Sequence, residues 1–158
     1  MTTPIITIQE WINASKEAVE EVASSVLGLE KAETLSVGTK IPPELSGSCI
    51  SLVSESGSVQ IGLFTSTDGC ISLGKAMMGM GPEEEFPESD IADAIGEVVN
   101  IIAGGIKRRL NSQVPIQLGL PIFISGSVEA GEQQEIAVVE VRLGSVTAYE
   151  LIIKSKDA

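Results

Sequence analysis

The chain has 158 residues, enough for one domain with a substantial core, and 43% of them are hydrophobic against 20% charged, a balance that excludes a disordered chain. The formal net charge of -12 and the 3% share of aromatic residues disfavour nucleic acid or an anionic membrane as a partner. No apolar run reaches the length of a membrane span and the N-terminus lacks the pattern of a signal peptide, so we expect a cytoplasmic protein.

Metal sites of the common kinds are not predicted. The chain has no histidine, and Cys49 and Cys70 stand far apart without a CxxC motif. These absences remove the usual zinc patterns and the commonest general base. We therefore expect two buried, reduced thiols and no metal or cofactor bound by the chain itself.

The first predicted element is a helix from Ile8 to Leu27. Its apolar residues recur at helical spacing among Glu and Lys, and Gly28 follows where a helix C-terminal glycine would stand. Two β-rich runs, Cys49–Val53 and Val59–Phe64, are joined by turn residues and predict a hairpin.

Two further helices are predicted in the middle of the chain. A short helix runs from about Ile71 to Met78 and ends at the glycines and the proline of positions 79–82. The acidic stretch Glu83–Glu85 is then predicted to lie in a surface loop. The clearest helix is Ile91–Leu110, where isoleucine and valine repeat at helical spacing and Asp90 can cap the start.

Three strands are predicted after this helix, at Ile122–Ser125, Ile136–Leu143 and Val146–Ile153, the last two forming a tight hairpin. The order of elements predicts one α+β domain over residues 1–158, with a mixed or antiparallel sheet built from hairpins and about three helices packed on it. A helix leading into a hairpin in each half suggests a weak two-fold repeat.

Polar residues share one face of the helix Ile91–Leu110. At 100° per residue, Asp93, Glu97, Asn100 and Gly104 fall within about 60° of one another, opposite the apolar stripe. Such a face is suited to docking another protein, with Gly104 allowing a close approach. The same pattern is also common on helix faces that only meet solvent. The basic cluster Lys107–Arg109 fits the C-terminal end of the helix.

The segment Asp93–Gly104 closely resembles the signature of the CheC and CheX phosphatases, in which an Asp or Ser precedes Glu by four positions, Asn follows three positions later, and a Pro stands further on. The residues around Trp11 and the run Leu120-Pro121-Ile122 also resemble that family, so the resemblance covers most of the chain. The loop before Pro121 is slightly shorter than the family's, and Gly105 stands where the family often has Asn.

This resemblance implies a phosphatase acting on the aspartyl-phosphate of a CheY-like response-regulator receiver domain in chemotaxis. Asn100 would orient the hydrolytic water, and Glu97 would pair with a receiver Lys. Asp93, Gly104 and Pro121 would support docking. The phosphorylated receiver would supply the Mg²⁺, so the chain itself needs no cofactor.

A second signature, found in CheC-type members, is incomplete in the first predicted helix. Glu10 and Asn13 have the right spacing, but Ile6 stands where Asp or Ser is required. We interpret Asn13 as structural, and a single site is similar to CheX. The resemblance to CheX also implies a homodimer, for which the strand Val146–Ile153 could present an edge.

Two other functions compete with this one. The run Gly69–Ala76 differs from a phosphate-binding P-loop in its last residue, and Ala76 supplies no hydroxyl for Mg²⁺. A non-catalytic module that binds a receiver or a flagellar switch component would use the same helix face as the phosphatase. Nothing in the sequence separates the productive orientation of a water from simple contact.

Overall fold

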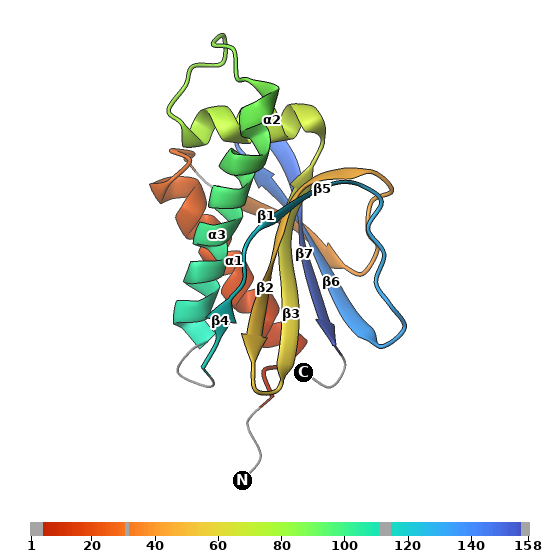
Figure 1. The fold of residues 1–158 in the computed structure, drawn as a ribbon. Helices are drawn as coiled ribbons and strands as arrows, with labels where there is room; N and C mark the ends of the chain where they lie inside the picture. The colour runs from red at the N-terminus through yellow and green to blue at the C-terminus, as the bar shows by residue number, and fades with distance from the viewer. Residues whose placement is uncertain (1–4, 31, 111–114, 156–158) are drawn as a thin grey trace.

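The computed structural model describes residues 5–30, 32–110 and 115–155. Within these ranges the helices and strands are, in chain order, α1 (Ile8–Ser25), β1 (Ala32–Gly38), β2 (Leu45–Ser54), β3 (Gly57–Thr65), α2 (Thr67–Met77), α3 (Ile91–Leu110), β4 (Gln117–Leu118), β5 (Ile122–Gly126), β6 (Gln134–Leu143) and β7 (Val146–Ser155). The three predicted helices and both predicted hairpins are present (Figure 1), whereas β1 and β4 have no counterpart among the predicted elements. Asp90, the expected cap of α3, ends a 3-10 turn, η1 (Glu88–Asp90), that leads into the helix.

The described strands join one seven-stranded antiparallel sheet with the order β1-β6-β7-β3-β2-β4, and β5 also pairs with β2. Strand β7 pairs with β6 on one side and with β3 on the other. The prediction that Val146–Ile153 offers a free edge is therefore wrong. Its run Leu151-Ile152-Ile153 is continuously apolar, a pattern typical of a central strand that is covered on both faces.

The two halves of the chain are arranged around a pseudo-two-fold axis. The hairpin β2–β3 turns at Ser54–Gly57 and the hairpin β6–β7 turns at Leu143–Val146. The difference in residue number between these two turns also separates Gly62 from Leu151. These two residues pair with each other where β3 meets β7. The topology thus contains the helix-and-hairpin repeat that the sequence suggested.

Helices α1 and α3 lie side by side on one face of the sheet (Figure 1), and the main core lies between the helices and the strands. This core is almost entirely aliphatic, as the low aromatic content requires. A smaller apolar cluster lies on the opposite face of the sheet, with the buried residues Leu45, Phe64, Val138 and Leu151.

Helix α1 begins and ends with standard capping contacts. The Thr7 hydroxyl accepts a hydrogen bond from the Glu10 backbone N–H, and the Glu10 carboxylate accepts one from the Thr7 backbone N–H. This reciprocal capping box satisfies backbone donors that a helix start otherwise leaves free. At the other end Gly28 has a φ of 65°, as predicted for a glycine that terminates a helix.

Helix α3 packs closely on α1. A Cβ atom at Gly105 would lie 3.1 Å from the Cβ of Ala18, so small residues set the crossing point. Arg109 then pairs with Glu17 at 3.2 Å and with Glu21 at 2.8 Å, and its hydrogen bond to Glu21 holds the pKa of that carboxyl below its usual value. The basic cluster at the end of α3 therefore joins the two helices.

Helix α2 contradicts the P-loop hypothesis. The helix already begins at Thr67, with the Ser66 hydroxyl accepting a hydrogen bond from the Gly69 backbone N–H, so the run Gly69–Ala76 is helical. A P-loop cradles phosphate with an open loop between a strand and a helix, and such a loop is not formed here. Lys75 donates instead to the carbonyl oxygen of Pro82 at 2.9 Å. The predicted start at Ile71 was late because the N-terminal turn of α2 is polar.

Candidate functional site

Helix α3 separates its two faces as the sequence predicted. The buried side is lined by Ile91, Ala94, Ile95, Val98, Val99, Ile102, Ala103, Ile106 and Leu110. On the opposite side Asp93 and Glu97 are exposed, while Asn100 and Gly104 are half-buried. The structure therefore brings these four sequence-predicted residues together on one accessible helix face.

Glu97 and Asn100 stand one helical turn apart on this face. Neither side chain makes a hydrogen bond or an ion pair with another described residue. Both groups are therefore available to a partner. A Cβ atom placed at Gly104 would have no neighbour within 4 Å, so the surface is open beyond Asn100.

Pro121 lies beside the same helix although it is distant in sequence. A Cβ atom at Gly96 would lie 3.5 Å from the Pro121 Cγ atom, and Gly96 directly precedes Glu97. The strand segments on either side of Pro121, β4 and β5, both pair with β2 and form the edge of the sheet next to α3. Pro121 thus packs against α3 at Gly96. The sequence pattern of the helix does not reveal this contact.

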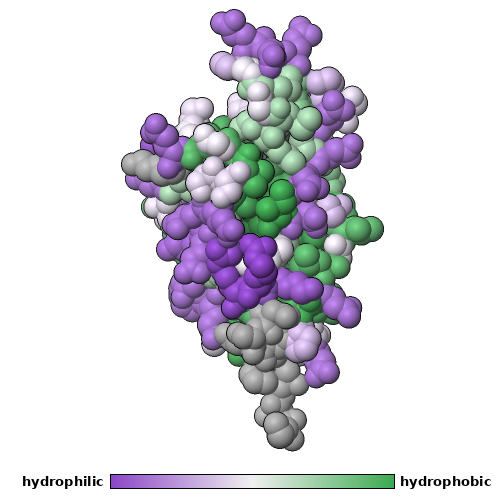
Figure 2. All heavy atoms as spheres, turned by 90° about the vertical axis from the view of Figure 1, so that its left-hand side faces the viewer, coloured by the Kyte–Doolittle hydropathy of each residue, from purple (hydrophilic) through white to green (hydrophobic). Residues whose placement is uncertain are grey.

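Figure 2, which looks at the molecule from the side of α1 and α3, shows a broad hydrophilic area beside a smaller hydrophobic one. The overall charge of the chain is -12, so long-range attraction from this protein favours cationic groups on a partner. A carboxylate such as that of Glu97 is suited to pairing with one of them.

The incomplete second signature on α1 is occupied by local contacts. Glu10 serves the capping box, and the side-chain amide of Gln9 donates to the Asn13 carbonyl oxygen at 2.9 Å. Ala18 and Gly105, where the two helices cross, are separated by a certain number of residues along the chain. The same number of residues separates Glu10 from Glu97 and Asn13 from Asn100. The two positions are thus equivalent in the repeat, but Glu10 holds a helix end and Glu97 is available to a partner.

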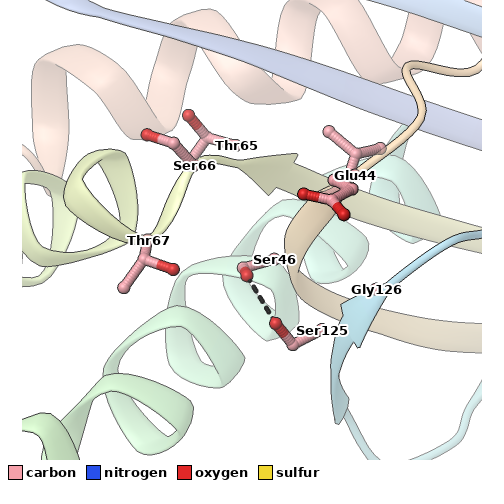
Figure 3. Close-up of a pocket in the computed structure, with 8 residues that line it drawn as sticks. Glu44, Ser46, Thr65, Ser66, Thr67, Ser125 and Gly126 are labelled. Atoms are coloured by element: carbon pink, nitrogen blue, oxygen red, sulfur yellow. Dashed lines mark hydrogen bonds between the residues drawn. The ribbon is translucent and has the colours of Figure 1, made fainter.

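A hydroxyl-lined cleft of about 380 Å³ was not predicted from the sequence. It lies where β2, β5 and the start of α2 meet, and Figure 3 shows Ser46 and Ser125 pointing toward each other across it. Their hydroxyl oxygens are 2.8 Å apart, and Thr65 donates to the carbonyl oxygen of Thr147 at 2.7 Å. The hydrogen bond between Ser46 and Ser125 joins β2 to β5, and that of Thr65 joins β3 to β7.

The two cysteines are free, Cys70 buried and Cys49 half-buried. Burial raises the pKa of both thiols, for Cys70 to about 11, which disfavours the reactive thiolate. Among the described residues, no group of three or more His, Cys, Asp or Glu side chains is placed to hold a metal ion. None of the helices in the described ranges is both long and apolar enough to cross a membrane.

Solved structures of similar fold include CheC-like and CheX proteins. A CheC-like superfamily protein from Shewanella sp. PV-4 has 18% identity and a TM-score of 0.76, with 94% of this chain and 98% of that one covered. CheX in a CheX–CheY–BeF3–Mg²⁺ complex from Borrelia burgdorferi has 18% identity, a TM-score of 0.74 and coverage of 96% and 98%. The FliM middle domain from H. pylori has 12% identity, a TM-score of 0.66 and coverage of 95% and 94%.

The comparison with curated proteins found no match. The family model described as chemotaxis phosphatase CheX matches residues 47–141. The matched range runs from β2 to β6 and includes Glu97, Asn100 and Pro121. Because this match spans more than half of the chain and the fold agrees with it, the chain belongs to the CheX family of chemotaxis phosphatases.

Proposed function

We propose that this protein hydrolyses the aspartyl-phosphate of a CheY-like receiver domain at the face of α3 that carries Glu97 and Asn100. The observation that carries the proposal is the pairing of an exposed carboxylate and a half-buried carboxamide, one turn apart and without partners among the described residues. Family membership supports the reaction class. The similar CheX from Borrelia burgdorferi, whose structure is a complex with CheY, BeF3 and Mg²⁺, supports the kind of partner.

The mechanism needs little from the phosphatase. A phosphorylated receiver supplies the acyl phosphate, the Mg²⁺ ion and a Lys that neutralises the phosphoryl oxygens. The Asn100 carboxamide enters that site and holds a water in line with the phosphorus, while Glu97 pairs with the receiver Lys and fixes the register. Orientation of the water is then the main catalytic device, and the chain needs no metal or histidine base of its own.

Three further residues support docking in this proposal. Asp93 continues the polar face one turn before Glu97, Gly104 leaves room for the partner's backbone, and Pro121 fixes the edge strand against Gly96. The cytoplasmic location expected from the sequence belongs to the same proposal.

The direct test is phosphate release from a receiver that has been phosphorylated with acetyl phosphate. The wild-type protein is expected to accelerate release when present in catalytic amounts, with the Mg²⁺ requirement following the receiver. A second candidate, a non-catalytic module that binds the receiver or a flagellar switch component, is favoured by the similarity in fold to the FliM middle domain. Binding without any acceleration of release would select that candidate.

Replacing Glu97 with alanine is expected to weaken receiver binding by about 30-fold or more, because losing one partner of a desolvated charge pair costs on the order of 2 to 5 kcal/mol. The fold should be unaffected, since Glu97 is exposed and lies outside the core. Binding of the BeF3-activated receiver to both proteins measures the effect, with Glu20→Ala on the exposed face of α1 as the control. Equal affinities for Glu97→Ala and wild type would remove Glu97 from the interface.

We propose that the protein forms a homodimer, with β1 in place of the predicted edge at β7. Strand β1 pairs with β6 on one side, and Leu35 and Val37 are exposed on it at 37% and 49%. An exposed apolar edge strand is a template for pairing with a second copy. Light scattering at micromolar concentration should give a dimer mass for the wild type and a smaller mass for Val37→Lys. A wild-type monomer would refute the dimer without affecting the phosphatase.

A further inference from the structure

An unpaired acid lies between the sheet and α1. The side chain of Glu150, on β7, is 1% exposed, and neither of its carboxyl oxygens has a hydrogen-bond partner among the described residues. Its cross-strand neighbours, Leu63 and Val139, are apolar. Buried polar groups are normally paired, so an isolated carboxyl in this position calls for an explanation.

A small cavity of about 10 Å³ adjoins this carboxyl, with room for roughly one water molecule. The charged groups that line it besides Glu150 are Lys16, which is half-buried, and Glu20, which is exposed, both on α1. The side chains that strands β1 and β6 contribute are apolar or carry a hydroxyl group, and the buried residues of β3 on this face are uncharged. The next charged pair along this face of β7 is Lys154 with Glu135, at 3.7 Å.

Packing alone does not account for the acid. The pseudo-two-fold axis that passes through the pair Gly62 and Leu151 relates Glu150 to Ile61, which is also about 1% exposed and belongs to the main core. An aliphatic side chain thus fills the equivalent position in the other half of the molecule. The carboxyl group of Glu150 adds a property that the fold itself does not require.

We propose that Glu150 is a pH-responsive latch for α1: the neutral carboxyl lets the helix close over the sheet, and ionisation in mildly alkaline solution loosens the helix. Burial raises the pKa of Glu150 from 4.5 to about 8. An ionised carboxylate requires water or a cation, and the cavity holds about one water. Because the cavity has so little room, admitting further water requires α1 to move outward.

Movement of α1 would reach the helix that carries the candidate site. Helix α1 contacts α3 where Ala18 meets Gly105, and Glu17 and Glu21 of α1 both bind Arg109 of α3. Loosening α1 therefore removes support from α3, on which Glu97 and Asn100 lie. The latch itself is a property of the free protein and does not depend on the proposed reaction.

The direction of the pH effect follows from proton linkage. The folded chain retains the Glu150 proton up to about pH 8, whereas the unfolded chain releases it near pH 4.5. The stability contributed by this group is fully present below about pH 4.5, declines as the pH rises, and is lost once the pH passes the folded pKa. A neutral side chain at this position removes that decline.

Trp11 provides the readout, because it is the single tryptophan of the chain, lies on α1 and is 4% exposed. Wild-type fluorescence is titrated from about pH 6 to about pH 9.5, below the ordinary pKa of Tyr and Lys. We expect a red shift with a midpoint near pH 8 for the wild type and none for Glu150→Gln. Lys16→Met should raise the midpoint, since the Lys16 charge favours the ionised carboxylate.

Thermal unfolding gives a second measurement. At pH 9 Glu150→Gln should unfold at a temperature roughly 10 °C above that of the wild type, with a much smaller difference near pH 5. Glu150→Leu, of similar volume, should also lack the fluorescence transition and keeps the test valid if the glutamine variant folds poorly. A flat wild-type titration, or the same red shift in both variants, would overturn the latch. Neither measurement involves a receiver, so failure here leaves the phosphatase proposal unaffected.

Discussion

Replacing Asn100 with alanine is expected to reduce the acceleration of receiver dephosphorylation by about 100-fold or more, because no other group on α3 then positions the hydrolytic water. Asn100 is half-buried on the outward face of the helix and makes no side-chain hydrogen bond within the described part of the chain. Alanine also has a higher helix propensity than asparagine, so the free energy of unfolding should change by less than about 1 kcal/mol.

Phosphate release and receiver binding should be measured side by side for Asn100→Ala. Binding should be largely retained, in contrast to Glu97→Ala, because the amide acts on water inside the complex. Asn13→Ala is the matched control, an exposed asparagine on α1 whose side chain contacts Gln9. Normal phosphate release by Asn100→Ala at saturating receiver would refute the mechanism, even if the wild-type protein proves to be a phosphatase.

Replacing Gly47 with alanine is expected to destabilise the protein by about 4 kcal/mol or more, enough to prevent folding of many domains. A Cβ atom at this position would collide with the backbone carbonyl oxygen of Leu63 and lie 2.8 Å from the Cα atom of Phe64. Backbone atoms of a central strand cannot move aside without breaking the β2–β3 ladder. The next residue, Ser48, lies beneath Gly96, so the change would also disturb the support of α3.

Gly104→Ala is the control for this prediction. A Cβ atom there meets no other atom within 4 Å, and alanine stabilises a helix by about 1 kcal/mol relative to glycine. Urea unfolding should therefore give a higher midpoint for Gly104→Ala and a much lower one for Gly47→Ala. An unchanged midpoint for Gly47→Ala would contradict the register of β2 against β3. A loss of receiver affinity in Gly104→Ala would support the docking role proposed for this glycine.

The candidate site on α3 was predictable because it depends on local geometry. The apolar stripe of this helix repeats every turn, which determined its bounds at Ile91 and Leu110 and the side of the helix that faces solvent. Once those are known, Glu97 and Asn100 must lie together on the exposed side. The hairpins were predictable for a similar reason, since alternation and turn residues are read over a few neighbouring positions.

Strand order and the edges of the sheet were decided by the tertiary structure. The sequence of β7 predicts a strand, but whether it lies at an edge depends on its pairing with β3. Strand β1 was missed because its pairing with β6 is interrupted by a register shift between Thr34 and Ser36 and its outer residues are exposed, which obscures the alternation. Pairing between distant segments depends on which surfaces meet in the folded chain, and local periodicity carries little information about that.

The sequence by itself determined the composition of the core, the bounds of α3, the polar face with Glu97 and Asn100, and the resemblance that named the family. Three contacts could be seen only in the tertiary structure. Pro121 lies against Gly96, α1 crosses α3 at Ala18 and Gly105, and Glu150 is buried beneath α1. Each of these contacts joins residues far apart in the chain. Their environment, including burial and the resulting pKa of Glu150, exists only after the elements have packed, because desolvation is a property of the assembled core.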